Sequence, residues 1–337
     1  MQQVALIGFG FMGAVHAAVY RALPAVRIAA VVDPRGEELR PVLREAGLDD
    51  VPVCPDLASA AARSGFSFVD ICLPTDLHRE AAAQAFDLGK HVFCEKPIAL
   101  TVEDAVAMTS SARARGVQFM VGHCIRFWPE YVELKRMVES GEHGRLVSLS
   151  LARRNGRPGY SAGNWVNQPE RCLGAALDLH IHDTDFLVHL LGTPPAVFSR
   201  GVRDATGWSS ITTQYLYEDC AVSAEGGWNY PRNAGFQMRF TAVFEHAVLD
   251  FDSRQTPSLT LTAGDGEPTP LVLPALPDGA AAEIPPGYYH ELAYFVDCLE
   301  SGKPVENSTG GQAAESLRVT LCEIASADAG KILPTNQ

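Results

Sequence analysis

The feature that most constrains the fold is a regular alternation of short apolar runs with helix-like segments in the first third of the chain. The apolar runs lie at residues 4–7, 28–32, 68–73, 91–94 and 117–121. Continuous apolar runs of this length are typical of strands buried on both faces. The helix-like segments between them lie at residues 12–23, 37–46, 77–88 and 101–115. This alternation predicts a doubly wound parallel sheet with helices on its faces.

A glycine-rich loop follows the first apolar run. The sequence IGFGFMG places Gly8, Gly10 and Gly13 in the spacing G-x-G-x-x-G between a strand and a helix. In Rossmann dinucleotide-binding domains the first glycine allows a tight turn, the second lets backbone approach a pyrophosphate, and the third lets helix and strand pack closely. The helix N-terminus then offers unpaired N–H groups to the phosphates. The residues predicted to bind the cofactor here are Gly8, Phe9, Gly10, Phe11, Met12 and Gly13.

The second apolar run ends at an acidic residue, Asp33. A carboxylate at this point in a Rossmann domain accepts hydrogen bonds from the adenosine ribose hydroxyls. Its negative charge repels the 2′-phosphate of NADP, so Asp33 favours NAD as the cofactor. Arg35 lies two residues further on and is suited to bind that phosphate, so NADP remains the alternative.

The pattern changes after Gly122. Residues 196–273 contain several strand candidates with no helix between them, which predicts a largely antiparallel sheet. Helical periodicity returns near the C-terminus. We therefore expect an α/β protein with a Rossmann domain over residues 1–122. Residues 123–337 should form a second α/β domain with a large, mostly antiparallel open sheet.

Charge and hydropathy narrow the classes of partner. The chain has 27 Lys and Arg against 40 Asp and Glu, a formal net charge of −13, and such a surface repels nucleic acid and anionic membranes. No run reaches the roughly 18–20 apolar residues that span a bilayer, and the N-terminus lacks the basic start of a secretory signal. We expect a cytoplasmic protein with reduced cysteines that acts on a small molecule and binds neither nucleic acid nor membrane.

Acidic and imidazole side chains crowd together in the sequence GAALDLHIHDTD, residues 174–185. On a strand, alternate residues would share a face and two histidines could bind a metal. On a helix, Asp178 and His182 share a face, because residues four apart are neighbours. Apolar residues follow the 3–4 spacing of a helix as far as Gly192, which is too long for a typical strand. The prediction is a helix without a metal site, and a solvated helix face without chemistry is the alternative.

A lysine lies at the carboxyl edge of the predicted parallel sheet. The sequence HVFCEKP places Glu95 and Lys96 at the end of a strand, where ligands bind in such folds. Pro97 favours an extended backbone at Lys96. Residue types alone leave three roles open for this lysine: phosphate binding, an ion pair with Glu95, or polarisation of a substrate hydroxyl.

Six segments in this order resemble the glucose–fructose oxidoreductase and inositol dehydrogenase family (Gfo/Idh/MocA). They are GFGFMG, ICLPTDLHRE, EKP, VGHCIRFWPEY, GAALDLHIHDTDFLVHLLG and YYHELAYFVDCLESGKP. The resemblance covers nearly the whole chain. It implies an NAD(P)-dependent dehydrogenase that oxidises a secondary hydroxyl of a sugar, sugar derivative or cyclitol, or reduces the matching ketone. It also implies a homo-oligomer, either a dimer or a tetramer.

The same resemblance implies roles for individual residues. Lys96 would hold the reacting oxygen, His182 would exchange its proton, and Asp178 would orient the substrate or the other two side chains. An imidazole, with a usual pKa of about 6.5, is suited to proton transfer near neutral pH. The residues implied to flank the nicotinamide end of the cofactor are Leu73, Pro74, Thr75, His78, Glu95, Lys96 and His123.

His180 departs from the family, which commonly has glycine between the acid and the histidine of this helix. The larger side chain either adds a polar contact near the substrate or fills space beneath the helix. A polar segment further upstream could line a substrate pocket; its members are Arg153, Arg154, Asn155, Tyr160, Asn164 and Trp165. Of these, Arg154 and Asn155 are predicted to bind substrate hydroxyls, and Trp165 is predicted to stack on a sugar face. The catalytic trio of Lys96, Asp178 and His182 is also predicted to contact the substrate.

Two other functions fit the same residues. One is an enzyme whose tightly bound NAD serves as a recycling oxidant in a reaction with no net redox change. The other is a cofactor-binding regulator with an idle redox site, against which the intact trio of Lys96, Asp178 and His182 argues.

Overall fold

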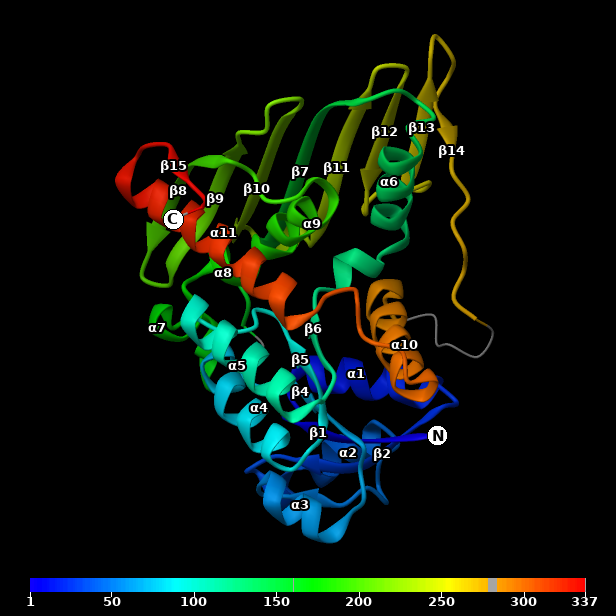
Figure 1. The fold of residues 1–337 in the computed structure, drawn as a ribbon, viewed down its shortest axis with the longest axis vertical. Coiled ribbons are helices and arrows are strands. Elements are labelled where there is room, and N and C mark those ends of the chain that lie inside the picture. The colour runs from blue at the N-terminus through cyan, green and yellow to red at the C-terminus, as the bar shows by residue number, and fades with distance from the viewer. Residues whose placement is uncertain (160, 278–283, 337) are drawn as a thin grey trace. The chain divides into compact units, whose positions relative to one another are not determined.

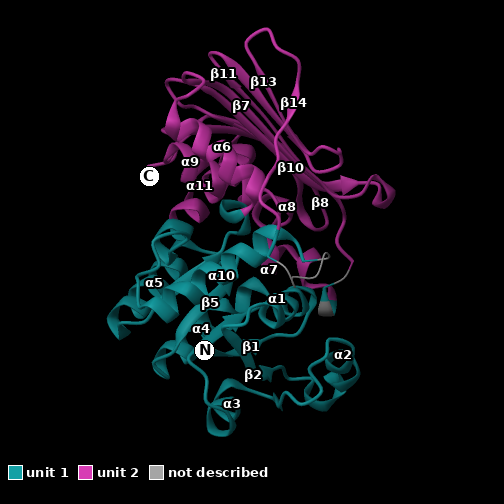
Figure 2. Ribbon diagram, turned by 90° about the vertical axis from the view of Figure 1, so that its right-hand side faces the viewer, with its two compact units in different colours: residues 1–127, 160–163, 276–314 teal, residues 128–159, 164–275, 315–337 magenta. Residues whose placement is uncertain are grey.

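A computed structural model describes residues 1–159, 161–277 and 284–336. The chain divides into two compact units, which Figure 2 colours separately. Unit 1 comprises residues 1–127, 160–163 and 276–314, and unit 2 comprises residues 128–159, 164–275 and 315–337. Each predicted domain was one continuous stretch of chain. In the structure the chain instead returns to unit 1 at residue 276, so a C-terminal helix joins the unit that contains the N-terminal sheet.

Unit 1 contains the predicted parallel sheet, with strand order β3-β2-β1-β4-β5-β6 (Figure 1). The strands are β1 (Gln2–Ile7), β2 (Val26–Val32), β3 (Val53–Cys54), β4 (Phe68–Ile71), β5 (His91–Glu95) and β6 (Phe119–Gly122). The order reverses between β1 and β4, and open parallel sheets bind ligands beyond the carboxyl ends of their strands at such a switch point. The glycine loop follows β1 and the segment from Leu73 follows β4, so the two predicted cofactor segments start at this point.

Helices cover both faces of the unit 1 sheet. They are α1 (Phe11–Ala22), α2 (Arg40–Glu45), α3 (Leu57–Arg63), α4 (His78–Asp87), α5 (Val102–Arg115) and α10 (Pro286–Ser301). Met120 of β6 belongs to a buried cluster with residues of α1 and α10, whereas the ring of the adjacent Phe119 lies 5.4 Å from that of Phe86 in α4. Because successive strand residues point to opposite faces, α1 and α10 cover one face and α4 the other.

Unit 2 contains the predicted large sheet, in the order β14-β13-β12-β11-β7-β10-β9-β8-β15. Its strands are β7 (Leu146–Gly156), β8 (Ala196–Asp204), β9 (Gly207–Tyr215), β10 (Ala221–Tyr230), β11 (Gln237–Phe244), β12 (Ala247–Asp252), β13 (Leu259–Ala263), β14 (Thr269–Pro270) and β15 (Leu333–Pro334). Neighbouring strands are antiparallel except for the parallel pair β7 and β10. The predicted fold class is therefore confirmed.

A layer of helices packs on one face of the unit 2 sheet, where both views show α6, α9 and α11 on the same side (Figures 1 and 2). The helices are α6 (Pro129–Ser140), α7 (Pro169–Cys172), α8 (Ala175–Asp178), α9 (Ile181–Leu191) and α11 (Gly310–Ala329). Tyr131 of α6 joins the layers, since its ring lies 4.8 Å from Phe186 of α9 and 5.1 Å from Phe240 of β11. Among the described residues, no helix combines the length and the apolar content needed to cross a bilayer.

Candidate cofactor and catalytic site

The loop between β1 and α1 has a geometry that requires glycine at two of its three positions. Gly8 has a φ of +86°, and a Cβ atom at Gly13 would lie 2.1 Å from the carbonyl oxygen of Gly8. A Cβ atom at Gly10 would meet nothing within 4 Å, so open space lies in front of the N-terminus of α1. The residue at the N-cap position is Gly10, which has no side chain to cap the helix. The loop therefore fits a pyrophosphate that approaches backbone N–H groups closely.

Asp33 lies directly after β2, at the position predicted for the ribose-binding carboxylate. It is 4% exposed, and it accepts hydrogen bonds from the Phe9 backbone N–H at 3.0 Å and from Nε and Nη2 of Arg35 at 2.9 and 2.7 Å. Burial acts to raise the pKa of Asp33, but the hydrogen bonds from Arg35 and Phe9 outweigh it and lower the pKa. The carboxylate and guanidinium that were predicted to favour different cofactors thus form one ion pair.

Replacing Asp33 with alanine should weaken NADH binding more than NADPH binding. The variant loses the ribose acceptor and releases the Arg35 guanidinium for a 2′-phosphate. A hydrogen bond to a charged group contributes about 1.5–3 kcal/mol, so we expect the Kd for NADH to rise roughly 10- to 100-fold. Fluorescence titrations with both reduced cofactors measure the effect, and Arg35→Ala is the matched control. An equal loss of affinity for the two cofactors in Asp33→Ala would refute the ribose assignment.

His78, at the start of α4, bridges two of the predicted cofactor segments. Its ring is buried, with Nδ1 2.9 Å from the carbonyl oxygen of Pro97 and Nε2 2.9 Å from that of Leu73. Burial lowers the pKa of His78, which favours a neutral ring that donates to one of these carbonyls. His78 therefore ties the segment after β4, which also contains Pro74 and Thr75, to the turn after β5.

Lys96 follows β5 at the carboxyl edge of the sheet, as predicted. The residue is half-buried, and its backbone N–H donates to Oε2 of Glu95 at 3.0 Å. The Glu95 side chain is buried, with Oε1 3.2 Å from Nε2 of His16 in α1. His123 follows the neighbouring strand β6 and is also buried. The predicted nicotinamide-side residues thus gather at the carboxyl ends of three adjacent strands, and their contact with the cofactor stays a prediction.

The other part of the candidate site is the predicted helix of unit 2. The structure confirms that this segment is helical, but it forms two helices rather than one. Helix α8 ends at Asp178 and α9 begins at Ile181. Between them the His180 N–H donates to the Ala175 carbonyl at 2.9 Å, one residue further back than in a regular α-helix. Asp178 is half-buried and His182 is buried. Because the wide turn lies between them, their shared face stays a prediction, as does their meeting with Lys96 of unit 1 around one hydroxyl.

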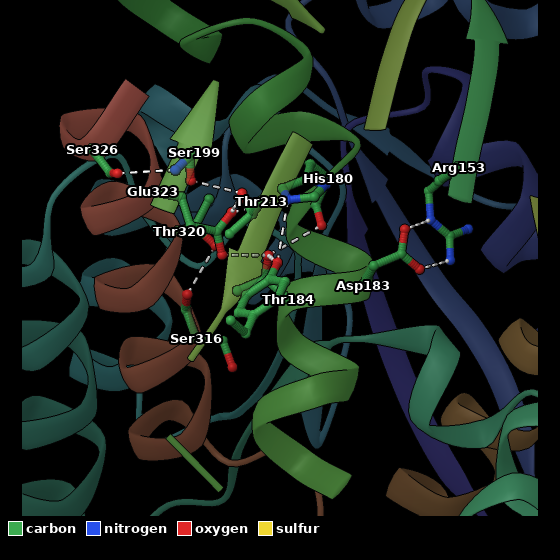
Figure 3. Close-up of polar contacts among 11 residues, drawn as sticks. Arg153, His180, Asp183, Thr184, Ser199, Thr213, Ser316, Thr320, Glu323 and Ser326 are labelled. Carbon is green, nitrogen blue, oxygen red and sulfur yellow. Dashed lines mark hydrogen bonds and ion pairs between the residues drawn. The ribbon is translucent and has the colours of Figure 1, made fainter. Parts of the chain in front are cut away.

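His180 points into the interior of unit 2 (Figure 3). Its Nε2 atom lies 2.9 Å from Oε2 of Glu323 in α11, and both side chains are fully buried. The hydroxyl of Thr184 donates to the other Glu323 oxygen at 2.9 Å. A Cβ atom on Gly226 of β10 would lie 2.8 Å from that of His180, so this glycine makes room for the ring. Of the two predicted roles, His180 therefore fills space beneath the helix, and it anchors the start of α9 to α11.

A second buried ion pair holds α9 to the sheet. Arg153 of β7 donates from Nε and Nη2 to the two carboxylate oxygens of Asp183 at 3.1 and 2.8 Å, as Figure 3 shows. The side chains are 2% and 0% exposed, and Nη2 also reaches the hydroxyl of Tyr131 at 3.3 Å. The sequence suggested Arg153 as a pocket residue. In the structure it binds Asp183, the residue next to His182.

Asp183→Asn should strongly destabilise unit 2, because it removes the carboxylate charge that faces the buried Arg153 guanidinium. Breaking one partner of a buried pair typically costs about 3–5 kcal/mol, whereas replacing both partners with apolar residues costs much less. Urea unfolding followed by tryptophan fluorescence measures the change. The control is the double variant Arg153→Met/Asp183→Leu, which should be more stable than Asp183→Asn. A single variant within about 1 kcal/mol of wild type would contradict this role.

The predicted sugar-binding residues upstream occupy three different environments. Arg154 is partly exposed and pairs with Glu225 of β10. Asn155 accepts the Gly156 backbone N–H through its side-chain oxygen at 2.8 Å. Trp165 is half-buried against a cluster formed by Val166, Cys172, Ala175, Leu179 and Trp228. Tyr160 lies outside the described residues. Trp165 therefore packs beside α8, which ends at Asp178, and the sugar contacts of all three remain predictions.

Sequence reasoning missed several residues that hold these groups in place. They are His16, Asp70 and Glu291 of unit 1, and Gly226 and Glu323 of unit 2. A local signal existed for Glu291, because it lies on the apolar stripe of its helix, three residues after Tyr288 and four before Phe295.

Comparisons with known proteins add to this geometry. Residues 2–123 match a family described as an oxidoreductase family with an NAD-binding Rossmann fold, and residues 131–249 match the GFO/IDH/MocA C-terminal domain. Inositol 2-dehydrogenase of Rhizobium meliloti (strain 1021) is 25% identical over 93% of each chain. The 2,7-anhydro-N-acetylneuraminate hydratase of Escherichia coli (strain K12) is 31% identical over 56% of this chain, but this match spans only 50% of the hydratase.

A solved structure has the same fold. Levoglucosan dehydrogenase in complex with NADH and levoglucosan superimposes with a TM-score of 0.85 and covers 100% of both chains at 21% sequence identity. The two family matches cover the glycine loop, the Lys96 turn and the helix with Asp178 and His182. The chain therefore belongs to the Gfo/Idh/MocA family of oxidoreductases, with an NAD-binding Rossmann domain at its N-terminus.

Proposed function

We propose that the protein is an NAD(P)-dependent dehydrogenase that oxidises a secondary hydroxyl of a sugar, sugar derivative or cyclitol, or reduces the matching ketone. The observation that supports this most is the arrangement of polar groups at the sheet edge of unit 1. It combines the glycine loop, the buried Asp33 carboxylate and Lys96 at the carboxyl edge of one sheet. Relatives named for dehydrogenation of inositol and levoglucosan support the class of substrate.

In this proposal the residues of the chain share the work on one C–OH group. NAD, when bound, accepts the hydride from the carbinol carbon. His182 takes the hydroxyl proton during oxidation and returns it during reduction. The Lys96 ammonium holds the oxygen and stabilises its developing negative charge. Asp178 orients the hydroxyl or the other two side chains. The substrate loses one hydride and one proton in total, and the product is a ketone.

A substrate panel tests the proposal. Cyclitols, sugars and anhydrosugars are incubated with NAD or NADP, and the absorbance of the reduced nicotinamide is followed. We expect turnover with at least one polyol and faster turnover with NAD. Absence of reduction across the panel, with NADH still bound, would favour the regulator without redox chemistry.

The similarity to a hydratase favours a second candidate, because a hydration has no net redox change. The same trio would then serve a reaction in which NAD is reduced and reoxidised within one catalytic cycle. Such an enzyme should keep NAD through purification, as mass spectrometry of the denatured protein would reveal. It should also form product without accumulating NADH, whereas stoichiometric NADH release would exclude it.

We also propose that the protein forms a homo-oligomer through the nine-stranded sheet of unit 2. In the described part of the chain, no helix covers the face of this sheet opposite α6, α9 and α11. Sedimentation analysis should therefore give a dimer or a tetramer, and a monomer at micromolar concentration would contradict the proposal.

A further inference from the structure

Glu291 of α10 is a buried carboxyl group that the proposed reaction does not use. The side chain is 0% exposed, and neither of its oxygens has a hydrogen-bond partner among the described residues. One of its oxygens lies within 4.8 Å of ligand atoms of both His16 and Glu95. A buried carboxylate without a partner is strongly unfavourable, so this group must either be neutral or face a cation.

His16 of α1 lies between two other carboxyl groups in the same interior. Its Nδ1 atom is 2.8 Å from Oδ2 of Asp70 in β4, and its Nε2 atom is 3.2 Å from Oε1 of Glu95 in β5. The second contact is an ion pair rather than an aligned hydrogen bond. A neutral imidazole carries one N–H, whereas an imidazolium carries two and can face both carboxylates. Burial acts to lower the pKa of His16, but the polar partners of the ring, among them the Asp70 carboxylate, outweigh burial and raise the pKa.

The charges around this interior cancel when Glu291 is neutral. Asp70 and Glu95 supply two negative charges, while His16 and the nearby Lys96 ammonium supply two positive charges. Burial raises the pKa of Glu291 and repulsion from Glu95 adds to the effect, and together they outweigh the attraction of His16, which acts to lower this pKa. Burial raises the pKa of the nearby tyrosines and thiols, which are Tyr20, Tyr288, Cys72 and Cys94, and it lowers the pKa of His78. These groups therefore carry no charge at neutral pH.

We propose that His16, Glu95 and Glu291 form a buried proton-holding cluster, with His16 charged and Glu291 neutral, that positions Lys96. One oxygen of Glu95 faces the His16 ring and the other accepts the backbone N–H of Lys96 at 3.0 Å. The imidazolium therefore fixes the carboxylate, and the carboxylate fixes the turn that carries the lysine. His16 and Glu95 act as positioning residues here, and this role of Lys96 rests on the proposed function.

A divalent metal ion is the competing occupant, because one imidazole and two carboxylates are a donor set that zinc accepts. The two assignments differ in the state of Glu291, which is neutral in the cluster and ionised as a metal ligand. Glu291→Gln separates them, since an amide imitates a neutral carboxyl group and is a poor zinc ligand. Glu300→Gln, on the same helix, is the matched control.

Infrared spectroscopy should detect the neutral carboxyl group directly. We expect wild type and Glu300→Gln to show the carbonyl stretch of a protonated carboxyl group at neutral pH, and Glu291→Gln to lack it. Absence of the band in wild type, or stoichiometric zinc that Glu291→Gln loses, would overturn the proposal.

The pH dependence of stability gives a second readout that needs no substrate. A neutral Glu291 keeps its proton in the native protein, whereas in the unfolded chain it ionises above a pKa of about 4.3. The stability linked to that proton is present below this pH and is lost as the pH rises toward the raised native value. Between about pH 5 and pH 8 the Tm of Glu291→Gln should therefore rise relative to that of wild type. Parallel curves would contradict a neutral Glu291.

His16→Gln tests the positioning role. Loss of the imidazolium should lower kcat roughly 10- to 100-fold while NADH affinity changes little, because a small displacement of a catalytic group is costly. A variant that folds and keeps wild-type kcat would overturn this role. The double variant His16→Gln/Glu95→Gln should have a higher Tm than His16→Gln, since it leaves no unpaired Glu95 charge, and a lower Tm would contradict the ion pair. An inactive wild type would refute the proposed function, while the infrared and Tm results would still decide the cluster.

Discussion

Lys96→Met should lower kcat/KM for the polyol substrate by about 10²–10³-fold, the usual effect of removing one group that stabilises a developing oxyanion. Methionine keeps much of the length and the apolar stem of the side chain but lacks the ammonium group. The backbone N–H of residue 96 still donates to Glu95, so the turn after β5 should persist. Steady-state kinetics in the direction of polyol oxidation measure the loss.

NADH binding distinguishes this role from phosphate binding. If Lys96 acts on the substrate oxygen, the Kd for NADH in Lys96→Met should stay within a few-fold of wild type. Lys90→Met is the matched control, because Lys90 belongs to the same unit and its ammonium group contacts only the Phe66 carbonyl and ring in the described chain. A variant that loses NADH affinity but keeps kcat would assign Lys96 to the cofactor instead.

His182→Asn should lower kcat by about 10²–10⁴-fold, the contribution typical of a positioned general base. Asparagine cannot accept and release a proton near neutral pH, so the ionisation of the base should also disappear from the pH profile of kcat/KM. The residual activity should then rise with hydroxide concentration. Profiles of wild type and variant over the stability range of the protein test this.

The control for this variant lies on the same helix. His189→Asn, at the far end of α9, should leave both kcat and the pH profile unchanged. If His182→Asn kept the wild-type profile at reduced rate, the imidazole would have a structural role and another group would be the base. The unfolding midpoints of both variants must be measured, because His182 is next to the buried Asp183.

Most strands and helices of unit 1 were predictable because their burial leaves a local pattern. Runs such as residues 4–7 are apolar because both faces of the strand are covered, and the glycines have roles fixed by their own backbone. Strand β3 and helix α3 were missed, since a two-residue strand and an alanine-rich helix carry little apolar periodicity. The return of α10 to unit 1 was missed as well, because periodicity predicts a helix but not the sheet on which it packs.

Sequence reasoning proposed residues for the candidate site, but it could not give their partners. Asp33 and Arg35 were interpreted as favouring alternative cofactors, and only the fold shows that they pair. His180 was recognised as unusual, but the space it fills depends on Gly226 and on Glu323 from other elements. These contacts join residues far apart in the chain, and no local pattern specifies them.

The central claim is that a carbinol hydrogen leaves as hydride to the bound cofactor while Lys96 and His182 manage the oxygen and its proton. The most direct test is a single turnover with a polyol that carries deuterium on the reacting carbon, followed by mass spectrometry of the nicotinamide. We predict one deuterium in each molecule of NADH and slower turnover than with the unlabelled polyol. Reduced cofactor without deuterium, or product formed without any label passing through the cofactor, would contradict the account.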